Sequence, residues 1–151
     1  MAKRILVPVD FSEFSPLALA RALEHATEAT EILLLHVYEP PHLGRPDHTM
    51  WVKVAGEMMP LADLVKSEAK EKLDALVEEY TPQTQAKIVP RLLEGRAAAT
   101  IAETAQMEGC DMIVLATHGR SGFKRLVLGS VAEAVVRRAE CPVLTVPPPN
   151  A

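Results

Sequence analysis

Short, continuous apolar runs alternate along this chain with longer segments of mixed character, and this alternation restricts the fold more than any other feature. The runs cover residues 4–9, 31–39, 86–95, 110–117 and 141–146. Runs of this kind are typical of strands that are covered on both faces, as in a parallel sheet. Proline cannot donate to a neighbouring strand, so Pro90 predicts that the 86–95 strand lies at an edge of the sheet.

Helical signals fill the segments between these runs. Ser15 followed by Pro16 is typical of a helix cap and a first helical residue. Apolar residues recur at three- and four-residue intervals over residues 61–80, with charged residues on the other face. The stretch "RAAATIAETAQMEG" predicts a helix ending at Gly109, and a last helix is expected from about Ser130. The chain is therefore predicted to contain five strands alternating with four helices.

Strands separated by helices are joined by right-handed crossovers and form parallel sheets with helices on both faces. We therefore predict an α/β fold, a three-layer doubly wound five-stranded parallel sheet of order 3-2-1-4-5 with four helices. The 48% hydrophobic content of the 151 residues is enough for one continuous core. Ligands bind in such sheets beyond the carboxyl ends of the strands, where the winding reverses. The polar stretches "PVDFS" and "THGRSG" then face the same crevice between the first and fourth strands.

Residues 39–60 are expected to form a long connection, because neither helical nor strand periodicity holds there. Connections of this length are usually functional or disordered. Met50, Trp51, Met58 and Met59 suit a lid over the crevice, a contact with a dimer partner or an interaction patch. The sequence does not choose among these three roles.

Composition argues against two classes of partner. A net charge of -4 leaves no broad positive face for nucleic acid. No run approaches the ~20 apolar residues of a spanning helix, so no membrane insertion is predicted.

The first residues, "MAKRILVPVDFSE", reach an acid too soon for a signal peptide, and we expect a cytoplasmic protein. Cys110 and Cys141 fit no metal-binding spacing and are expected to be structural thiols.

The stretch "ATHGRSGFKRLVLGSVAEAV" combines glycines with positive charge in a chain that is acidic overall. Arg120, Lys124 and Arg125 lie between Gly119 and Gly129. Bare glycine backbone and the free N–H groups at a helix start are typical of anion sites. Phosphate binding is therefore one interpretation of this stretch, and a turn with solvated basic residues is the other.

Structural roles also fit several of the candidate residues. Ser130 and Glu133 have the spacing of a helix capping box. Asp10 has the position of a helix cap or of an Asx turn, and Val37 could be an ordinary core residue. Each of these residues therefore has two interpretations at this point.

The same stretch resembles the nucleotide-binding signature of the universal stress protein family, G-x2-G-x9-G-[ST]. Gly119, Gly129 and Ser130 match its last three fixed positions, and Ala116 stands where the signature has its first glycine. The resemblance also covers "ILVPVDFSE", "ILLLHV", "DMIVLATHGRSG" and "CPVLTV", and so extends over nearly the whole chain.

The resemblance implies one domain over residues 1–147, with the 39–60 connection inside it and a short tail at 148–151. It implies a stress-response regulatory protein that binds ATP and Mg²⁺, hydrolyses ATP slowly or not at all, and signals through ligand-dependent conformation or partner binding. It also implies a homodimer formed through the last strand. The residues that it assigns to the nucleotide are Pro8, Asp10, Val37, Leu115, Ala116, Gly119, Gly129, Ser130, Val131 and Ala132. Asp10 is in addition the candidate for a contact with Mg²⁺.

Two other functions are consistent with parts of the sequence. The methyl group of Ala116 fits a nucleotide-free member of the family that acts as an interaction or chaperone-like protein. An adenylyl- or phosphoryl-transfer enzyme would need a dedicated acid, base or charge clamp, and the sequence holds no adenylylation motif. His36 and His118 are more typical of hydrogen-bonded structure than of catalysis, so no catalytic residue is predicted.

Overall fold

The computed structural model describes residues 4–39, 50–119 and 128–149. Five parallel strands form the main sheet in the order β5-β2-β1-β6-β7. The strands are β1 (Arg4–Pro8), β2 (Glu31–Tyr38), β5 (Lys87–Glu94), β6 (Met112–Ala116) and β7 (Val143–Val146). Since β5, β6 and β7 are the third, fourth and fifth strands of this sheet along the chain, the predicted order 3-2-1-4-5 is confirmed.

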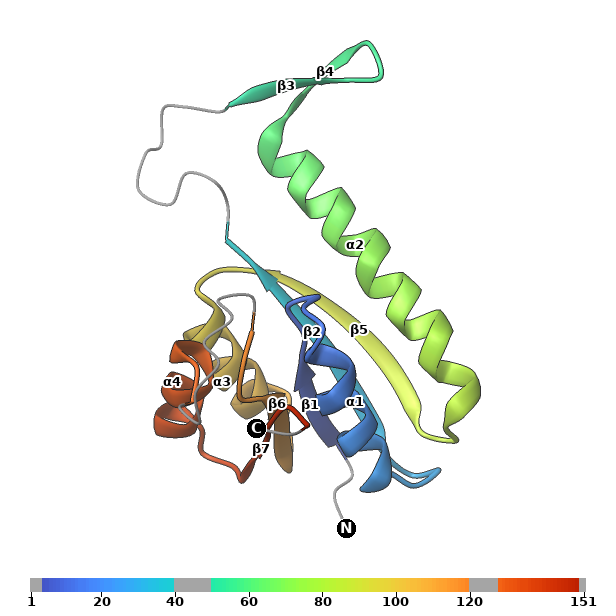
Figure 1. Ribbon diagram of the computed structural model, residues 1–151, viewed down its shortest axis with the longest axis vertical. Helices are drawn as coiled ribbons and strands as arrows, with labels where there is room; N and C mark the ends of the chain where they lie inside the picture. Colours follow the sequence, from blue (N-terminus) through green and yellow to red (C-terminus); the bar gives the residue numbers. More distant parts are fainter. Residues whose placement is uncertain (1–3, 40–49, 120–127, 150–151) are drawn as a thin grey trace.

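Helices cover both faces of the sheet (Figure 1). The helices are α1 (Ser15–Glu24), α2 (Leu61–Tyr80), α3 (Ala97–Met107) and α4 (Ser130–Arg138), with a 3-10 turn η1 (Thr81–Gln83) after α2. Alternate strand residues point to opposite faces. On one face Ile5 and Val7 pack with Leu19 of α1 and Leu73 of α2.

The other face of the sheet has a core of its own. Leu6, Leu33 and Ile113 pack there against Ile101 of α3 and Val135 of α4. All three strand residues are fully buried. Two apolar layers therefore hold the sheet, as expected for runs that are apolar on both faces. No helix in the described ranges is both long and apolar enough to cross a membrane.

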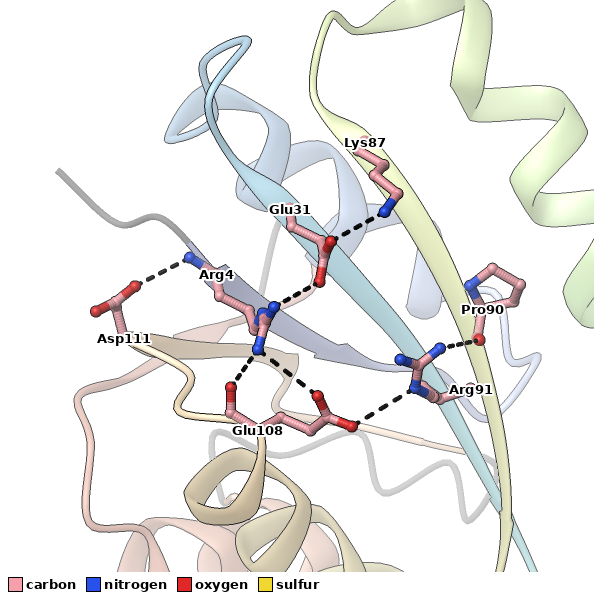
Figure 2. A network of polar contacts seen from close by, with 7 residues as sticks. All are labelled: Arg4, Glu31, Lys87, Pro90, Arg91, Glu108 and Asp111. Atoms are coloured by element: carbon pink, nitrogen blue, oxygen red, sulfur yellow. Dashed lines mark hydrogen bonds and ion pairs between the residues drawn. The ribbon is translucent and has the colours of Figure 1, made fainter.

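An ion network ties the amino ends of the strands together (Figure 2). The guanidinium of Arg4 lies 3.1 Å from Glu31 and donates to the carbonyl of Glu108 at 2.5 Å. Lys87 lies 3.3 Å from the same Glu31 carboxylate, and the backbone N–H of Arg4 donates to Asp111 at 2.9 Å. Arg4, Glu31 and Lys87 are the first residues of β1, β2 and β5. Charged side chains therefore link the three strands at this end of the sheet.

Part of the 39–60 connection has regular structure, contrary to expectation. Strands β3 (Trp51–Val54) and β4 (Glu57–Pro60) form an antiparallel hairpin that precedes α2. The turn between them is Ala55-Gly56, with φ of 50° and 90°. Positive φ at both central residues matches the right-handed twist of the flanking strands. Both strands are short, and their turn has alanine at a position where asparagine is typical. The sequence therefore gives no clear hairpin signal. Residues 40–49 lie outside the described ranges.

Candidate functional site

A cavity of about 310 Å³ lies at the carboxyl ends of β1, β2 and β6, where the winding of the sheet reverses. This is the position at which open α/β sheets bind ligands. The predicted site residues line this cavity without exception: Pro8, Asp10, Val37, Leu115, Ala116, Gly119, Gly129, Ser130, Val131 and Ala132. The structure therefore brings together residues that are far apart in the sequence, and their contact with a ligand stays a prediction.

Asp10 forms the turn between β1 and α1. Its Oδ1 accepts the N–H of Ser12 at 2.9 Å and the hydroxyl of Ser15 at 2.9 Å. The first of these contacts is an Asx turn, the structural role considered for this residue. Ser15 is not the helix cap that its position suggested. It is the first residue of α1, and its hydroxyl also accepts the backbone N–H of Asp10 at 3.1 Å. Both contacts of the hydroxyl are therefore with Asp10, and no side-chain hydrogen bond caps α1.

Gly119 lets the loop after β6 approach this aspartate closely. A Cβ at position 119 would collide with Oδ2 of Asp10. The two oxygens of the carboxylate therefore have different neighbours: Oδ1 accepts the hydrogen bonds of the turn, and Oδ2 lies against Gly119. Asp10 and Gly119 both line the cavity. The close approach to Asp10 therefore explains why position 119 is a glycine, whether or not a ligand binds here.

Gly129 has a similar steric role before α4. Its N–H donates to the carbonyl of Thr117 at 2.7 Å, and a Cβ there would lie 2.9 Å from the same oxygen. Glycine thus allows the start of α4 to lie directly beside the end of β6. The N–H of Gly129 is consequently committed to Thr117 rather than directed into the cavity.

The predicted capping box at Ser130 is wrong. The helix cap is Gly129, no side-chain hydrogen bond caps the helix, and Glu133 pairs with Arg137 at 2.6 Å instead. The helix starts one residue earlier than a serine cap would require, and its cap, Gly129, is bound to Thr117 at the end of β6. The first helical hydrogen bond runs from the N–H of Glu133 to Gly129. The amides of residues 130–132 therefore have no helix carbonyl as acceptor, and they lie at the cavity.

An apolar wall completes the cavity, and part of it was missed by sequence reasoning. Val37 and Leu115 come from β2 and β6, whereas Ala97 and Ile101 come from α3. Leu115 is 4% exposed and Ile101 is 3% exposed. The α3 residues carry no polar signal, so only the predicted packing of α3 against this side of the sheet could have pointed to them. The remaining lining residues are Val9, Ser15, Leu35, Thr117 and His118.

Both histidines considered above have hydrogen-bonded positions. His36 is buried, with Nδ1 2.7 Å from the carbonyl of Val9, and its ring lies 4.3 Å from the ring of Phe11. His118 lines the cavity, with Nδ1 2.7 Å from the hydroxyl of Thr117. These contacts fit the structural interpretation of the two side chains.

No group of three or more His, Cys, Asp or Glu side chains suited to a metal ion occurs within residues 4–39, 50–119 and 128–149. Asp10, the residue predicted to contact Mg²⁺, offers a single carboxylate. The basic residues Arg120, Lys124 and Arg125 lie outside the described ranges, as does Gly122.

Comparison with known proteins places the chain in a family. The family model described as "Universal stress protein family" matches residues 1–147. Universal stress protein MJ0531 of Methanocaldococcus jannaschii is 35% identical over 150 residues, which is 98% of this chain and 84% of that protein. The structure of MJ0577, from the same organism, has a TM-score of 0.78 at 28% identity, covering 99% of this chain and 98% of that one. UspA from Lactobacillus plantarum has a TM-score of 0.77 at 26% identity, with coverage of 95% and 97%.

Two further structures of similar fold were solved with nucleotides. One is a universal stress protein in complex with cAMP, with a TM-score of 0.69, and the other is a family member from Arabidopsis thaliana with AMP bound, with a TM-score of 0.65. At 20% identity, each shows a shared fold. The match over residues 1–147, together with the sheet order and the sequence identity to curated members, shows that this chain belongs to the universal stress protein family.

Proposed function

We propose that this chain binds an adenine nucleotide, ATP with Mg²⁺, in the cavity at the carboxyl ends of β1, β2 and β6. It would act as a regulatory protein of the stress response, signalling through ligand-dependent conformation or partner binding, with slow or no ATP hydrolysis. The observation that carries the proposal is that all of the residues assigned to the nucleotide line one cavity.

The chemistry of the cavity wall suits the parts of a nucleotide. Apolar side chains of Val37, Leu115 and Ile101 offer a surface for the adenine ring. Asp10 offers a carboxylate to the ribose hydroxyls, which are hydrogen-bond donors. The amides at the start of α4 and the positive end of its dipole favour phosphate oxygens. A cavity of about 310 Å³ is also within the usual range of small-ligand sites, about 300–1,000 Å³.

Magnesium fits this site only as an ion that the nucleotide brings with it. Mg²⁺ is commonly bound by one or two carboxylates together with substrate phosphates and water. Asp10 supplies one carboxylate, and Ser12 and Ser15 hold its Oδ1 in place. The ion would neutralise phosphate charge in a protein that itself has a net charge of -4. Relatives solved with AMP and with cAMP support an adenine nucleotide as the class of ligand.

A homodimer through the last strand is part of the proposal. Strand β7 is an edge strand of the main sheet, with β6 as its neighbour on one side. Its residues Val143, Leu144 and Thr145 are half-buried in the single chain. An edge strand offers backbone groups to a second strand. Pairing of β7 with its counterpart would cover this edge.

The test uses two valines on α4 that differ in their relation to the cavity. Val131 lines the cavity and is 41% exposed, whereas Val136 is 44% exposed and does not line it. Val131→Glu places a negative charge where phosphate is expected, and Val136→Glu is the matched control. Both substitutions are at exposed positions, so both variants should fold.

Melting temperature is measured with nucleotide-stripped protein, with and without ATP and Mg²⁺. For the unchanged chain and Val136→Glu, ATP at a hundredfold excess over Kd should raise the melting temperature by about 5–10 °C. Val131→Glu should lose most of this rise. Absence of a rise in the unchanged chain at millimolar ATP would contradict nucleotide binding.

A nucleotide-free role as an interaction protein is the second candidate, and Ala116 is the observation that favours it. Ala116 is in the cavity wall at the position where the signature has glycine. If its methyl group keeps the nucleotide out, Ala116→Gly should create a melting shift with ATP that the unchanged chain lacks. An equal shift in both proteins would remove the reason for this candidate.

A further inference from the structure

The β3–β4 hairpin projects from the amino end of α2, away from the main sheet (Figure 1). Its strands pair with Trp51 opposite Pro60 and Val54 opposite Glu57. It is joined to the start of α2 by a hydrogen bond from the N–H of Leu61 to the carbonyl of Met50, at 2.7 Å. A two-stranded hairpin is marginally stable in water, and three or more strands or a packed face are needed for independent stability.

The hairpin has one face that is strongly exposed. Residues directly opposite each other in an antiparallel pair share a face, so Trp51, Lys53 and Met58 lie on the same side. Trp51 is 55% exposed and Met58 is 57% exposed. Val52 and Val54, on the opposite side, are only half-exposed. Large apolar side chains that are exposed together indicate a contact surface.

The two edges of the hairpin differ in their capacity to pair. Paired residues of an antiparallel ladder alternate between those that exchange hydrogen bonds and those that do not. The bond between Leu61 and Met50 fixes this alternation, so the backbone groups of Trp51 and Lys53 point outward from β3. On β4 the corresponding outward positions are Met58 and Pro60. Pro60 has no N–H and is followed at once by α2, so β3 has the more complete pairing edge.

We propose that β3 pairs antiparallel with β3 of a second copy of this chain, around a two-fold axis at Val52. Trp51 of each copy is then opposite Lys53 of the other copy. These two residues exchange both backbone hydrogen bonds, because both point outward. The hairpins of the two copies together form a four-stranded sheet, which meets the requirement for independent stability.

Side-chain chemistry favours a second copy as the occupant of this edge. In the proposed register, the ammonium of Lys53 faces the indole ring of Trp51 across the axis, on the exposed face. Cation–π contacts of this kind form within about 6 Å of the ring centroid, and tryptophan is the strongest acceptor. The contact occurs twice because the pairing is symmetric, as in any two-fold interface. The edge is therefore complementary to itself in hydrogen bonding and in charge. The proposal concerns an interface separate from β7 and does not depend on nucleotide binding.

Cysteine pairing tests the axis directly. Val52 faces its counterpart across the axis at a non-hydrogen-bonded position, where Cα atoms are about 4.5 Å apart, within the range of a disulfide. Val54 is on the same face of the same strand, but its counterpart would be roughly 14 Å away. In the full-length protein under mild oxidation, Val52→Cys should give a covalent dimer at least tenfold faster than Val54→Cys. Cys110 and Cys141 are present in both variants, so their contribution cancels.

Trp51 supplies an independent measurement because it is the only tryptophan in the chain. Burial against a second copy should shift its emission to shorter wavelength as protein concentration rises. Lys53→Pro removes an outward N–H without removing a bond within the hairpin, and should keep the emission at long wavelength at all concentrations. Lys53→Gln, which keeps the N–H, should show an intermediate shift. Equal cross-linking of the two cysteine variants, or an emission maximum that does not depend on concentration, would overturn the proposal. Either outcome would count against the proposal even if sedimentation shows a dimer, because that dimer would then use another surface.

Discussion

Asp10 shows how one residue can serve the fold and the candidate site together. Its Oδ1 accepts hydrogen bonds from Ser12 and Ser15, which shape the turn after β1. Its Oδ2 lies against Gly119, and both residues line the cavity. The sequence suggested both the Asx turn and the ligand contact as alternatives, and the geometry allows both at once because the two oxygens have different surroundings. Substitutions can therefore separate the two roles.

Asp10→Asn should keep the fold and lose the magnesium dependence of nucleotide binding. The amide oxygen can still accept from Ser12 and Ser15, but the side chain has no negative charge. The additional rise in melting temperature that Mg²⁺ gives with ATP should disappear. ATP in the presence of a chelator should still give a rise, smaller than in the unchanged chain because the contact with the ribose hydroxyls is weaker. Asp10→Ala is the comparison, because it also removes the hydrogen bonds and should melt lower without ligand. An unchanged effect of Mg²⁺ in Asp10→Asn would contradict the metal contact.

Cys110 should make stability depend on pH in the alkaline range. Burial, with a smaller effect from Cys141, raises the pKa of the Cys110 thiol to about 11. In the unfolded chain a thiol has a pKa of about 8.5, so the unfolded state loses this proton first. The contribution of Cys110 to stability is therefore fully present below about pH 8.5 and is lost as the pH rises towards 11.

The free energy of unfolding, measured by urea denaturation between pH 8 and 11 with a reductant present, should fall less steeply in Cys110→Ala than in the unchanged chain. Burial also raises the pKa of Tyr80, which is present in both proteins and therefore cancels in the comparison. Identical slopes would show that the thiol of Cys110 is not protected by the fold.

At the scale of elements, helix and strand positions were predictable, whereas the residues that cap the helices were not. The 61–80 helix coincides with α2 because its apolar period is long and regular. Ser15 and Ser130 were misjudged as capping residues because tertiary neighbours decide these starts: Asp10 binds the Ser15 hydroxyl, and Thr117 binds the N–H of Gly129. The hairpin was missed because its turn has alanine where asparagine is typical.

Ala55→Asn should stabilise the hairpin. Ala55 has φ of 50°, a region that costs an L-residue with a Cβ roughly 1–2 kcal/mol and that asparagine tolerates better. A gain of about 1 kcal/mol would slow hydrogen exchange of the Val52 and Val54 amides about fivefold. The measurement is made at low protein concentration, so that association does not add protection. Gly56→Ala, at φ of 90°, should have the opposite effect. Unchanged protection in both variants would mean that the turn does not limit hairpin stability.

Across the whole molecule, the two ends of the sheet have different properties. The amino ends of β1, β2 and β5 are joined by charged side chains, and Arg91 extends this network to Glu108 at 3.7 Å (Figure 2). The carboxyl ends carry the cavity. The alternation of apolar strands with helices was sufficient to predict a doubly wound parallel sheet with a crevice at the carboxyl ends of its strands. The order 3-2-1-4-5 is one of the common orders of such sheets and does not follow from the alternation itself. The sequence could not predict Ala97 and Ile101 in the cavity wall, since apolar residues of a packed helix look alike in sequence whether they line a cavity or fill a core.

This division predicts that the two ends can be changed independently. Arg4→Met removes the central charge of the ion network and keeps an unbranched side chain at the first position of β1. Because the Arg4 side chain is 37% exposed, the loss should be modest, about 1 kcal/mol or about 2–4 °C in melting temperature. The difference from the unchanged chain should shrink in 1 M salt as the charges are screened, on a Debye length of about 3 Å.

The ATP-induced rise in melting temperature should be the same in Arg4→Met as in the unchanged chain, because the cavity is at the opposite end of the strands. Lys87→Met is the matched control, because the Lys87 side chain is 73% exposed and forms an ion pair with Glu31 at the edge of the same network. It should lower the melting temperature less than Arg4→Met. A smaller ATP-induced rise in Arg4→Met would mean that the ion network and the cavity are coupled through the strands. Since β1 links Arg4 directly to Pro8 and Asp10, it is the strand through which such coupling would have to pass.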